Sequence, residues 1–365
     1  HLQGLQRAGV EVRVIAPHDA GLPLEHEVGG VAVRRVRYGR DRHETIAYRG
    51  EMHQLVRSPA GAWRALRLVT ALARATRQEL DRWGPDVLDV HWLVPGGIAA
   101  RLAALPDPHL RVPVQLDVHG TDVALVGGGG LAEFVGRRAV AGADAVAAMS
   151  FPLAEELVRV LGRSADAVLP MPGAPAPPAT ERPLDGPVLA IGRLVPEKGH
   201  ADLVDAVGFL RAGGRDLRLV VVGDGPERDR LTERAADAEV PLTLPGARSP
   251  QDLEAHYRDA TIVVVPSHRE GFGLVAAEAL ARRRPVVAAA TGGLREIVDA
   301  TTGWPVPPAD PPALAGAIAE ILDDPAEADR RTLAGARRVE ERWSPDALGR
   351  RAAAQLAATA ARRRR

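Results

Sequence analysis

The chain has 365 residues, 46% of them hydrophobic and 26% charged, and its 47 basic and 47 acidic side chains give no formal net charge. This length is too great for one ordinary core and suits two domains, while the balanced charge provides no overall field that would attract nucleic acid or an anionic membrane. The absence of cysteine excludes disulfides, thiolate metal sites and a cysteine nucleophile.

The first residues have the pattern of the middle of a helix. Apolar residues recur at helical spacing over 2–8, no methionine opens the chain, and a strand-like alternation follows over 10–16. Because a strand must precede such a helix in a βαβ fold, we interpret the chain as a fragment that lacks its first, central strand. We expect a weakly stable first domain with unpaired strand edges. A targeting segment upstream of this sequence remains an alternative.

The rest of the first half alternates between two periodicities. Strand patterns at 87–91, 112–119 and 143–150 are separated by helical patterns at 62–83, 96–105, 131–141 and 152–161. Strands separated by helices of this length indicate βαβ units and a parallel sheet.

Residues 169–183, with the sequence LPMPGAPAPPATERP, cannot form a helix or an interior strand, and we interpret them as a linker. The alternation then restarts, with strands predicted at 188–192, 217–223, 261–266 and 285–289 and helices at 200–212, 226–237, 273–281 and 312–322. The predicted fold is α/β: two Rossmann-like, doubly wound parallel-sheet domains facing each other across a cleft, where strand ends bind ligands. The predicted boundaries are 1–168, linker 169–183, second domain 184–342, and a closing helix with a basic tail at 343–365.

No stretch approaches the roughly 20 apolar residues of a membrane span. We expect a cytoplasmic protein, and peripheral contact with the inner face of the membrane stays open. The arginines at 362–365 and 282–284 are interpreted as solvated charge, so no nucleic-acid partner is expected.

The segment 267–278, SHREGFGLVAAE, follows a predicted buried strand and runs into a helix. Gly271 and Gly273 allow the backbone to approach a ligand, and a helix start offers unpaired N–H groups. Glu270 and Glu278 are eight residues apart and can each hold hydroxyls of an elongated ligand. The alternative is a surface glutamate and a helix glutamate that flank a tight turn.

The segment 192–199, GRLVPEKG, also lies between a strand and a helix. Arg193 can contact phosphate bidentately and Lys198 supplies a compact charge, a combination that suits a diphosphate. The alternative is a solvated charged turn. The glycine-rich loop at 223–226, GDGP, is weak evidence by itself.

The segment 117–122, DVHGTD, ends a strand of the first domain. His119 can present an imidazole and a backbone carbonyl to a ligand, and Asp122 can take a hydroxyl or orient a neighbour. A purely structural role for His119 is the alternative.

Together these segments resemble the family 4 glycosyltransferases, which are retaining enzymes of the GT-B fold. The resemblance rests on GRLVPEKG at 192–199, GDGP at 223–226, EGFGLVAAE at 270–278 and GGLREIV at 292–298, and extends to HGTD at 119–122 and WSPDALGRR at 343–351. The sequence departs from the family before the linker, where LPMPGA at 169–174 replaces the usual Asn-Gly-x-Asp. The family's first strand and glycine-rich loop are also absent.

The resemblance implies roles for these residues. Arg193 and Lys198 bind the donor diphosphate, Glu270 the transferred sugar and Glu278 the ribose, while His119 faces the sugar from the other domain. The candidate catalytic residues are His119 and Glu270. The remaining candidates are donor-binding Gly271, Phe272, Gly273 and Leu274, with Asp122, Gly223 and Arg248 as further ones.

The implied reaction moves a sugar from a UDP- or GDP-linked donor to a hydroxyl of a glycan, lipid or small molecule. The resemblance implies no cofactor and no metal, because arginine and lysine take over the neutralising role. The sequence agrees, since no acidic pair is placed at a strand end as a metal-ligand set. No convincing carboxylate nucleophile is visible, and the resemblance implies that the acceptor attacks on the same face as the leaving phosphate. A nucleotide-sugar epimerase and a non-catalytic sugar-nucleotide-binding protein remain as alternatives.

Overall fold

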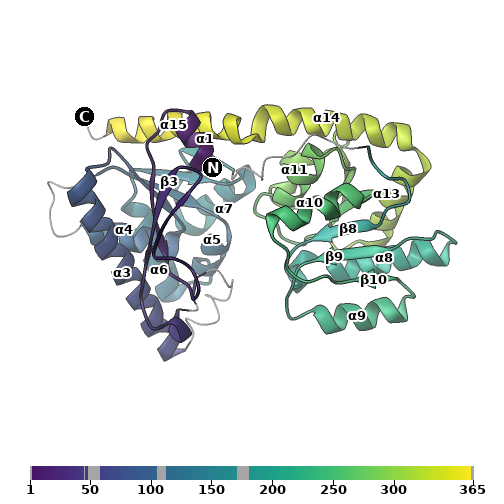
Figure 1. Cartoon of the computed structure of the whole chain (residues 1–365), viewed down its shortest axis with the longest axis horizontal. Helices are drawn as coiled ribbons and strands as arrows, with labels where there is room; N and C mark the ends of the chain where they lie inside the picture. The colour runs from purple at the N-terminus through teal and green to yellow at the C-terminus, as the bar shows by residue number, and fades with distance from the viewer. Residues whose placement is uncertain (1, 45, 48–57, 105–111, 171–180, 363–365) are drawn as a thin grey trace. The chain divides into compact units, whose positions relative to one another are not determined.

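The computed structural model describes residues 2–44, 46–47, 58–104, 112–170 and 181–362. The chain divides into an N-terminal unit, His1–Pro170 with Leu348–Arg365, and a C-terminal unit, Met171–Ala347 (Figure 1). The middle of the predicted linker, 171–180, lies outside the described residues.

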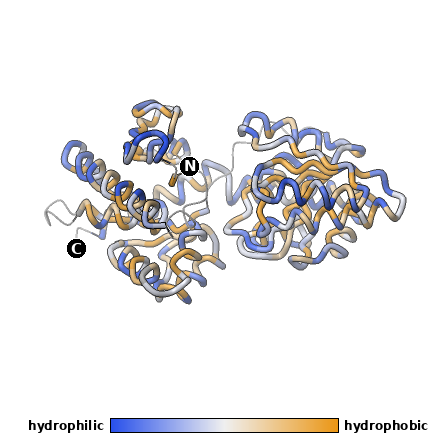
Figure 2. Tube along the Cα trace, turned by 90° about the horizontal axis from the view of Figure 1, so that it is seen from below, coloured by the Kyte–Doolittle hydropathy of each residue, from blue (hydrophilic) through white to orange (hydrophobic). Residues whose placement is uncertain are grey.

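The C-terminal unit is built on one six-stranded parallel sheet, with strand order β10-β9-β8-β11-β12-β13. Its central strands are continuous apolar runs because helices cover both faces of such a sheet. The strands are β8 (Val188–Ile191), β9 (Leu219–Val222), β10 (Leu242–Thr243), β11 (Ile262–Val265), β12 (Val286–Ala289) and β13 (Trp304–Val306). Figure 2 shows the hydrophobic segments of this unit inside and the hydrophilic ones outside.

The helices predicted for this unit are present, and residues 250–259 and 325–343, together with two short segments, form further helices that the sequence patterns did not predict. The helices are η4 (Pro196–Lys198), α8 (His200–Ala212), α9 (Arg228–Asp237), α10 (Pro250–Asp259), α11 (Leu274–Ala281), α12 (Leu294–Ile297), α13 (Pro311–Asp323) and α14 (Pro325–Trp343). Local sequence explains their starts: Asp310 accepts a hydrogen bond from the Ala313 amide at the beginning of α13, where proline occupies the first turn.

The strand order reverses between β8 and β11. The chain leaves β8 towards β9 and β10, and then returns to add β11, β12 and β13 on the other side. Ligands of open α/β sheets bind at such a switch point, outside the carboxyl ends of the strands. The loops after β8 and β11 flank this point, and they carry six of the candidate residues: Arg193, Lys198, Glu270, Gly271, Phe272 and Gly273.

The N-terminal unit contains two sheets among the described residues. The predicted parallel sheet is present as β4-β5-β6-β7, made of β4 (Leu88–His91), β5 (Val114–Val118), β6 (Ala145–Ala148) and β7 (Ala167–Val168). A second sheet has the order β1-β3-β2, made of β1 (Arg13–Pro17), β2 (Glu25–Val28) and β3 (Val31–Val36). No pairing joins β1 to β4 in the described part of the chain.

The sequence analysis missed β2 and β3. β2 is an exposed, charged edge strand, so it lacks the apolar alternation on which the prediction depended. The tight turn at Gly29 and Gly30 joins it antiparallel to β3, so this sheet is mixed rather than parallel.

The helices of the N-terminal unit include one at each end of the chain. They are α1 (Leu2–Arg7), η1 (Asp41–His43), α3 (Pro59–Trp83), η2 (Leu93–Gly97), α4 (Ile98–Ala104), α5 (Thr121–Val126), α6 (Gly130–Ala141), α7 (Phe151–Leu161) and, from Leu348 on, α15 (Pro345–Ala361). A Cβ on Gly349 would lie 2.4 Å from the Gly4 carbonyl carbon, so α15 and α1 are in backbone contact. Leu5 and Leu356 bury this contact. None of the described helices has the length and hydropathy that a bilayer crossing requires.

Candidate active site

Glycines allow the loops after β8 and β11 to touch. Gly199 has φ of +65°, and a Cβ there would lie 2.2 Å from the Pro266 carbonyl oxygen. The His268 amide donates to the Glu197 carbonyl across the same contact, at 2.9 Å. Only glycine permits this approach, which brings Lys198 to Glu270.

Lys198 and Glu270 form an ion pair, with Nζ 2.7 Å from Oε2. The Ser267 hydroxyl donates to the same oxygen at 3.2 Å, and both charged side chains are partly buried. Lys198 is the single lysine among the 47 lysines and arginines of the chain. The sequence nominated both residues but could not show that they hold each other.

Close backbone contact also fixes the loops after β8 and β9. A Cβ on Gly223 would lie 1.9 Å from the Gly192 carbonyl oxygen, so the GDGP loop packs directly on the segment that carries Arg193. The Arg193 side chain is exposed and makes no ion pair or side-chain hydrogen bond within the described part of the chain. Arg248 is likewise exposed, in the loop between β10 and α10.

The pair Gly292 and Gly293 clamps the backbone of Glu270. A Cβ on Gly292 would lie 1.7 Å from the Glu270 carbonyl oxygen, and the Gly293 amide donates to that oxygen at 3.3 Å. These contacts explain the double glycine of the GGLREIV motif, because any side chain there would push the Glu270 loop away from the sheet.

Helix α11 begins directly after this loop. Gly273 has φ of +103° and caps the helix, and Leu274 is its first residue. The first N–H groups of a helix lack intrahelical partners and attract anions, so the segment 271–274 offers its backbone to a ligand. The Phe272 ring is buried edge-on against Trp343, so only the main chain of Phe272 is available.

Glu278 lies on α11, and the Tyr257 hydroxyl on α10 donates to its Oε2 at 2.9 Å. Tyr257 is 1% exposed. The sequence analysis missed this tyrosine because the pairing joins two helices that lie on either side of β11 in the chain.

In the N-terminal unit, His119 lies at the carboxyl end of β5. His91 Nδ1 is 3.0 Å from His119 Nε2, and the Trp92 ring stacks on the His119 ring with centroids 5.6 Å apart. Burial, and then the neighbouring His91, lower the pKa of His119 to about 3. His119 is therefore neutral near pH 7.

Asp122 supports the His119 loop through main-chain contacts. Its carboxylate accepts hydrogen bonds from the amides of Leu93, His119, Gly120 and Val123, and it is 1% exposed. Burial raises the pKa of Asp122 despite these donors. The geometry gives Asp122 the role of orienting a neighbour rather than that of a ligand contact.

Comparison with known proteins decides the family. Residues 2–174 match the model of the glycosyl transferase 4-like domain, and residues 181–338 match that of the glycosyl transferases group 1. The D-inositol 3-phosphate glycosyltransferase of Kineococcus radiotolerans is 34% identical over 91% of this chain and 82% of its own. The glycogen synthase of Mycobacterium tuberculosis (strain CDC 1551 / Oshkosh) is 33% identical over 74% of this chain and 69% of its own.

This chain belongs to the family 4 glycosyltransferases.

Solved structures show the same GT-B fold for this glycosyltransferase. Sucrose-phosphate synthase from Thermosynechococcus elongatus superposes with a TM-score of 0.77 at 24% identity, covering 97% of this chain and 90% of its own. HepE of Anabaena in complex with UDP and glucose gives a TM-score of 0.69 at 17% identity, covering 94% of this chain and 99% of its own.

The glycosyltransferase also contains an acidic cluster that the sequence analysis missed. Asp89, His91 and Asp117 each bring one ligand-type atom within 4.8 Å of the others, at the ends of β4 and β5. The register of β4 against β5 brings the cluster together, because His91 lies directly opposite Asp117. Burial raises the pKa of both carboxyls, and the charge of Asp89 raises that of Asp117 further. The expectation that no acidic pair is placed at a strand end as a metal-ligand set was therefore wrong, while the expectation that no metal is used stays a prediction.

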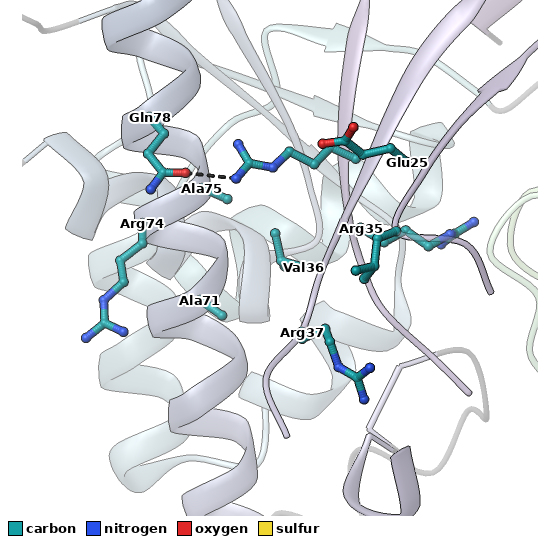
Figure 3. A pocket seen from close by; sticks show the side chains of 10 residues that line it. Glu25, Arg35, Val36, Arg37, Ala71, Arg74, Ala75 and Gln78 are labelled. Carbon is teal, nitrogen blue, oxygen red and sulfur yellow. Dashed lines mark hydrogen bonds between the residues drawn. The ribbon is translucent and has the colours of Figure 1, made fainter. Parts of the chain in front are cut away.

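A pocket of about 400 Å³ lies between β3 and α3 of the N-terminal unit (Figure 3). None of the candidate residues lines it; arginines do, among them Arg34, Arg37 and Arg74. Arg34 is paired with Glu79, and Arg37 with Asp41 and Glu44. Internal acids thus neutralise much of its charge.

Proposed function

We propose that this glycosyltransferase moves a sugar from a nucleoside diphosphate sugar to an acceptor hydroxyl with retention of the anomeric configuration. One observation carries the proposal: an ammonium, a guanidinium and two carboxylates stand on adjoining loops and a helix at the switch point of the C-terminal sheet. Cations suit a diphosphate, and carboxylates suit sugar and ribose hydroxyls.

The charges match what changes during the reaction. The leaving diphosphate gains negative charge as the glycosidic bond breaks, and the fixed cations Lys198 and Arg193 stabilise that charge in the transition state. The backbone amides at 271–274 add donors from the start of α11. In the proposed division, Glu270 holds the sugar and Glu278 the ribose.

The proposal needs no metal ion, since these two cations supply the charge that a divalent ion would otherwise provide. His119, neutral by its lowered pKa, is the proposed contribution of the N-terminal unit to catalysis. A neutral imidazole can accept or donate a hydrogen bond without bringing a second charge to an oxocarbenium-like sugar.

UDP is the nucleotide we propose to test first, because the similar HepE structures hold UDP and UDP-glucose. The relatives' names point to two acceptor probes, a glucan and an inositol phosphate. The acceptor side is expected to be a polyhydroxylated small molecule or glycan.

The test is an assay of UDP release from UDP-glucose, with maltotetraose or myo-inositol 3-phosphate as acceptor and GDP-mannose as alternative donor. Transfer of glucose with an α-linked product, read from the anomeric proton coupling, supports the proposal. Release of free sugar whether or not acceptor is present favours the epimerase alternative. Tight UDP binding without turnover on any donor favours a non-catalytic binding protein.

A further inference from the structure

A buried tyrosine holds one of the two candidate carboxylates. Tyr257 stands on α10, is 1% exposed, and donates its phenol proton to Glu278 Oε2 at 2.9 Å. Burial, and then the adjacent Glu278 charge, raise the pKa of Tyr257 well above its usual range. The phenol therefore stays protonated, and able to donate a hydrogen bond, near neutral pH.

The tyrosine is itself held from two sides. The Arg284 guanidinium donates to the Tyr257 carbonyl at 2.7 Å, and the Arg282 guanidinium lies over the phenol ring, 4.7 Å from its centroid. Arg282 also donates to the Glu278 carbonyl at 3.0 Å and is anchored on Glu254. Both arginines are buried, so these contacts restrict the Tyr257 ring. The expectation that the arginines at 282–284 are solvated charge was therefore wrong for these two, because their guanidinium groups bind main-chain carbonyls of α11 and α10.

A carboxylate on a helix can rotate about its terminal bonds, and it holds a pair of vicinal hydroxyls well only when its plane is fixed. The Tyr257 hydroxyl removes this freedom before any ligand binds, because an ordered donor already occupies one oxygen. Preorganisation of this kind favours a ligand that offers hydroxyls to the carboxylate and gives nothing to a ligand that lacks them.

We propose that Tyr257 is a positioning residue that makes the donor site selective for ribonucleotides over deoxyribonucleotides, acting through Glu278. This inference rests on the proposed function, in which Glu278 binds the ribose. It adds a specificity determinant from α10, an element that carries none of the residues nominated by sequence.

The experiment compares UDP with 2′,3′-dideoxy-UDP, which lacks both ribose hydroxyls, by calorimetric titration of the full chain. The wild type should bind UDP at least about 10-fold more tightly, since hydrogen bonds to charged groups contribute that much or more. Tyr257→Phe should weaken UDP binding about 10-fold and leave dideoxy-UDP binding within about twofold, so that the ratio collapses. If Tyr257→Phe weakens the binding of both ligands equally, or of neither, the ratio of the two affinities is unchanged and the inference is overturned. Equal losses would show that the tyrosine has a purely structural role.

Three further variants separate the outcomes. Tyr38→Phe removes another buried tyrosine hydroxyl, which lies in the N-terminal unit and accepts a hydrogen bond from the Ile46 amide. This variant should leave the ratio of the two affinities unchanged. Adding Tyr257→Phe to Glu278→Gln should change the ratio no further than Glu278→Gln alone. 4-Aminophenylalanine at position 257 restores a donor and should restore the ratio, which keeps the test decisive if the phenylalanine variant is poorly folded.

Failure of the underlying proposal looks different. If the wild type binds UDP and dideoxy-UDP equally, the ribose role of Glu278 is wrong and the inference falls with it. If Glu278→Gln loses the preference while Tyr257→Phe keeps it, only the role of Tyr257 is wrong.

Discussion

The Lys198 ammonium lies 2.7 Å from Glu270 Oε2, so two side chains proposed for different parts of the donor hold each other in place. The contact depends on Gly199, whose missing side chain lets the two loops meet. A change at either residue therefore alters the other, and mutational effects at the two positions should not be additive.

Replacing Lys198 by alanine should weaken UDP binding and lower turnover by roughly 10²-fold or more, because the leaving diphosphate loses a fixed cation. Lys198→Arg keeps the charge but replaces a compact ammonium by a planar fork, so it should recover only part of the loss. Titration with UDP and UDP-release kinetics measure both effects. An alanine variant with wild-type affinity and rate would refute the diphosphate role.

Because Lys198 is the single lysine, it can be labelled selectively. Reductive methylation with ¹³C-formaldehyde should give one lysine dimethyl resonance besides that of the terminal amine. UDP should shift this resonance, since the phosphate replaces part of the Glu270 contact, and uridine, which lacks phosphate, should leave it in place. If the chemical shift of this resonance does not change at a saturating concentration of UDP, the proposal is contradicted.

The two glutamates should separate by ligand. Glu270→Gln should lower turnover of UDP-glucose but leave UDP binding nearly intact, because UDP lacks the sugar that Glu270 is proposed to hold. Glu278→Gln should weaken the binding of both, since both carry the ribose. Equal losses on both ligands for both variants would disprove this division.

Activity should withstand a chelator. Excess EDTA is expected to change the rate by less than about twofold, because Arg193 and Lys198 are proposed to supply the positive charge that a divalent ion would otherwise provide. Asp89→Asn tests the one strand-end cluster near His119, and EDTA should affect this variant and the wild type alike. Loss of activity in EDTA that magnesium or manganese restores would show that a metal takes part.

His200, the first residue of α8, should make the C-terminal unit sensitive to acid. It is 4% exposed, and its ring nitrogens make no well-formed hydrogen bond to the described residues. Burial lowers its pKa to about 4; the nearby Arg193 and Gly192 backbone opposes this shift only in part, and the Lys198 charge adds to it. The unfolded chain therefore takes up a proton first as the pH falls below the ordinary value of about 6.5, and stability is lost from there down to about pH 4.

This single group should lower the free energy of unfolding by about 2 kcal/mol between pH 7 and pH 5. His200→Phe should reduce the pH dependence by that amount while the other groups contribute as before. Hydrogen exchange of the β8 and β11 amides at the two pH values measures it. An identical slope in the variant and the wild type would show that His200 is not held neutral.

The sequence by itself determined the class of fold, the second domain and the nominated residues of the donor loops. Residues 188–191, 219–222, 262–265 and 286–289 are short continuous apolar runs that alternate with helical patterns and glycine-rich loops, and such local patterns need no tertiary information to be recognised. The exposed, charged strand β2 was not predicted from the sequence, because an edge strand with polar faces has no apolar alternation.

Only the tertiary structure decided which residues act on one another. The pairing of Lys198 with Glu270 spans 72 residues, and those of Tyr257 with Glu278 and of His91 with His119 span 21 and 28. The order of the strands and the register of β4 against β5 bring these residues together. Strand order and register follow from how the whole sheet buries its faces, and no local stretch of sequence specifies them.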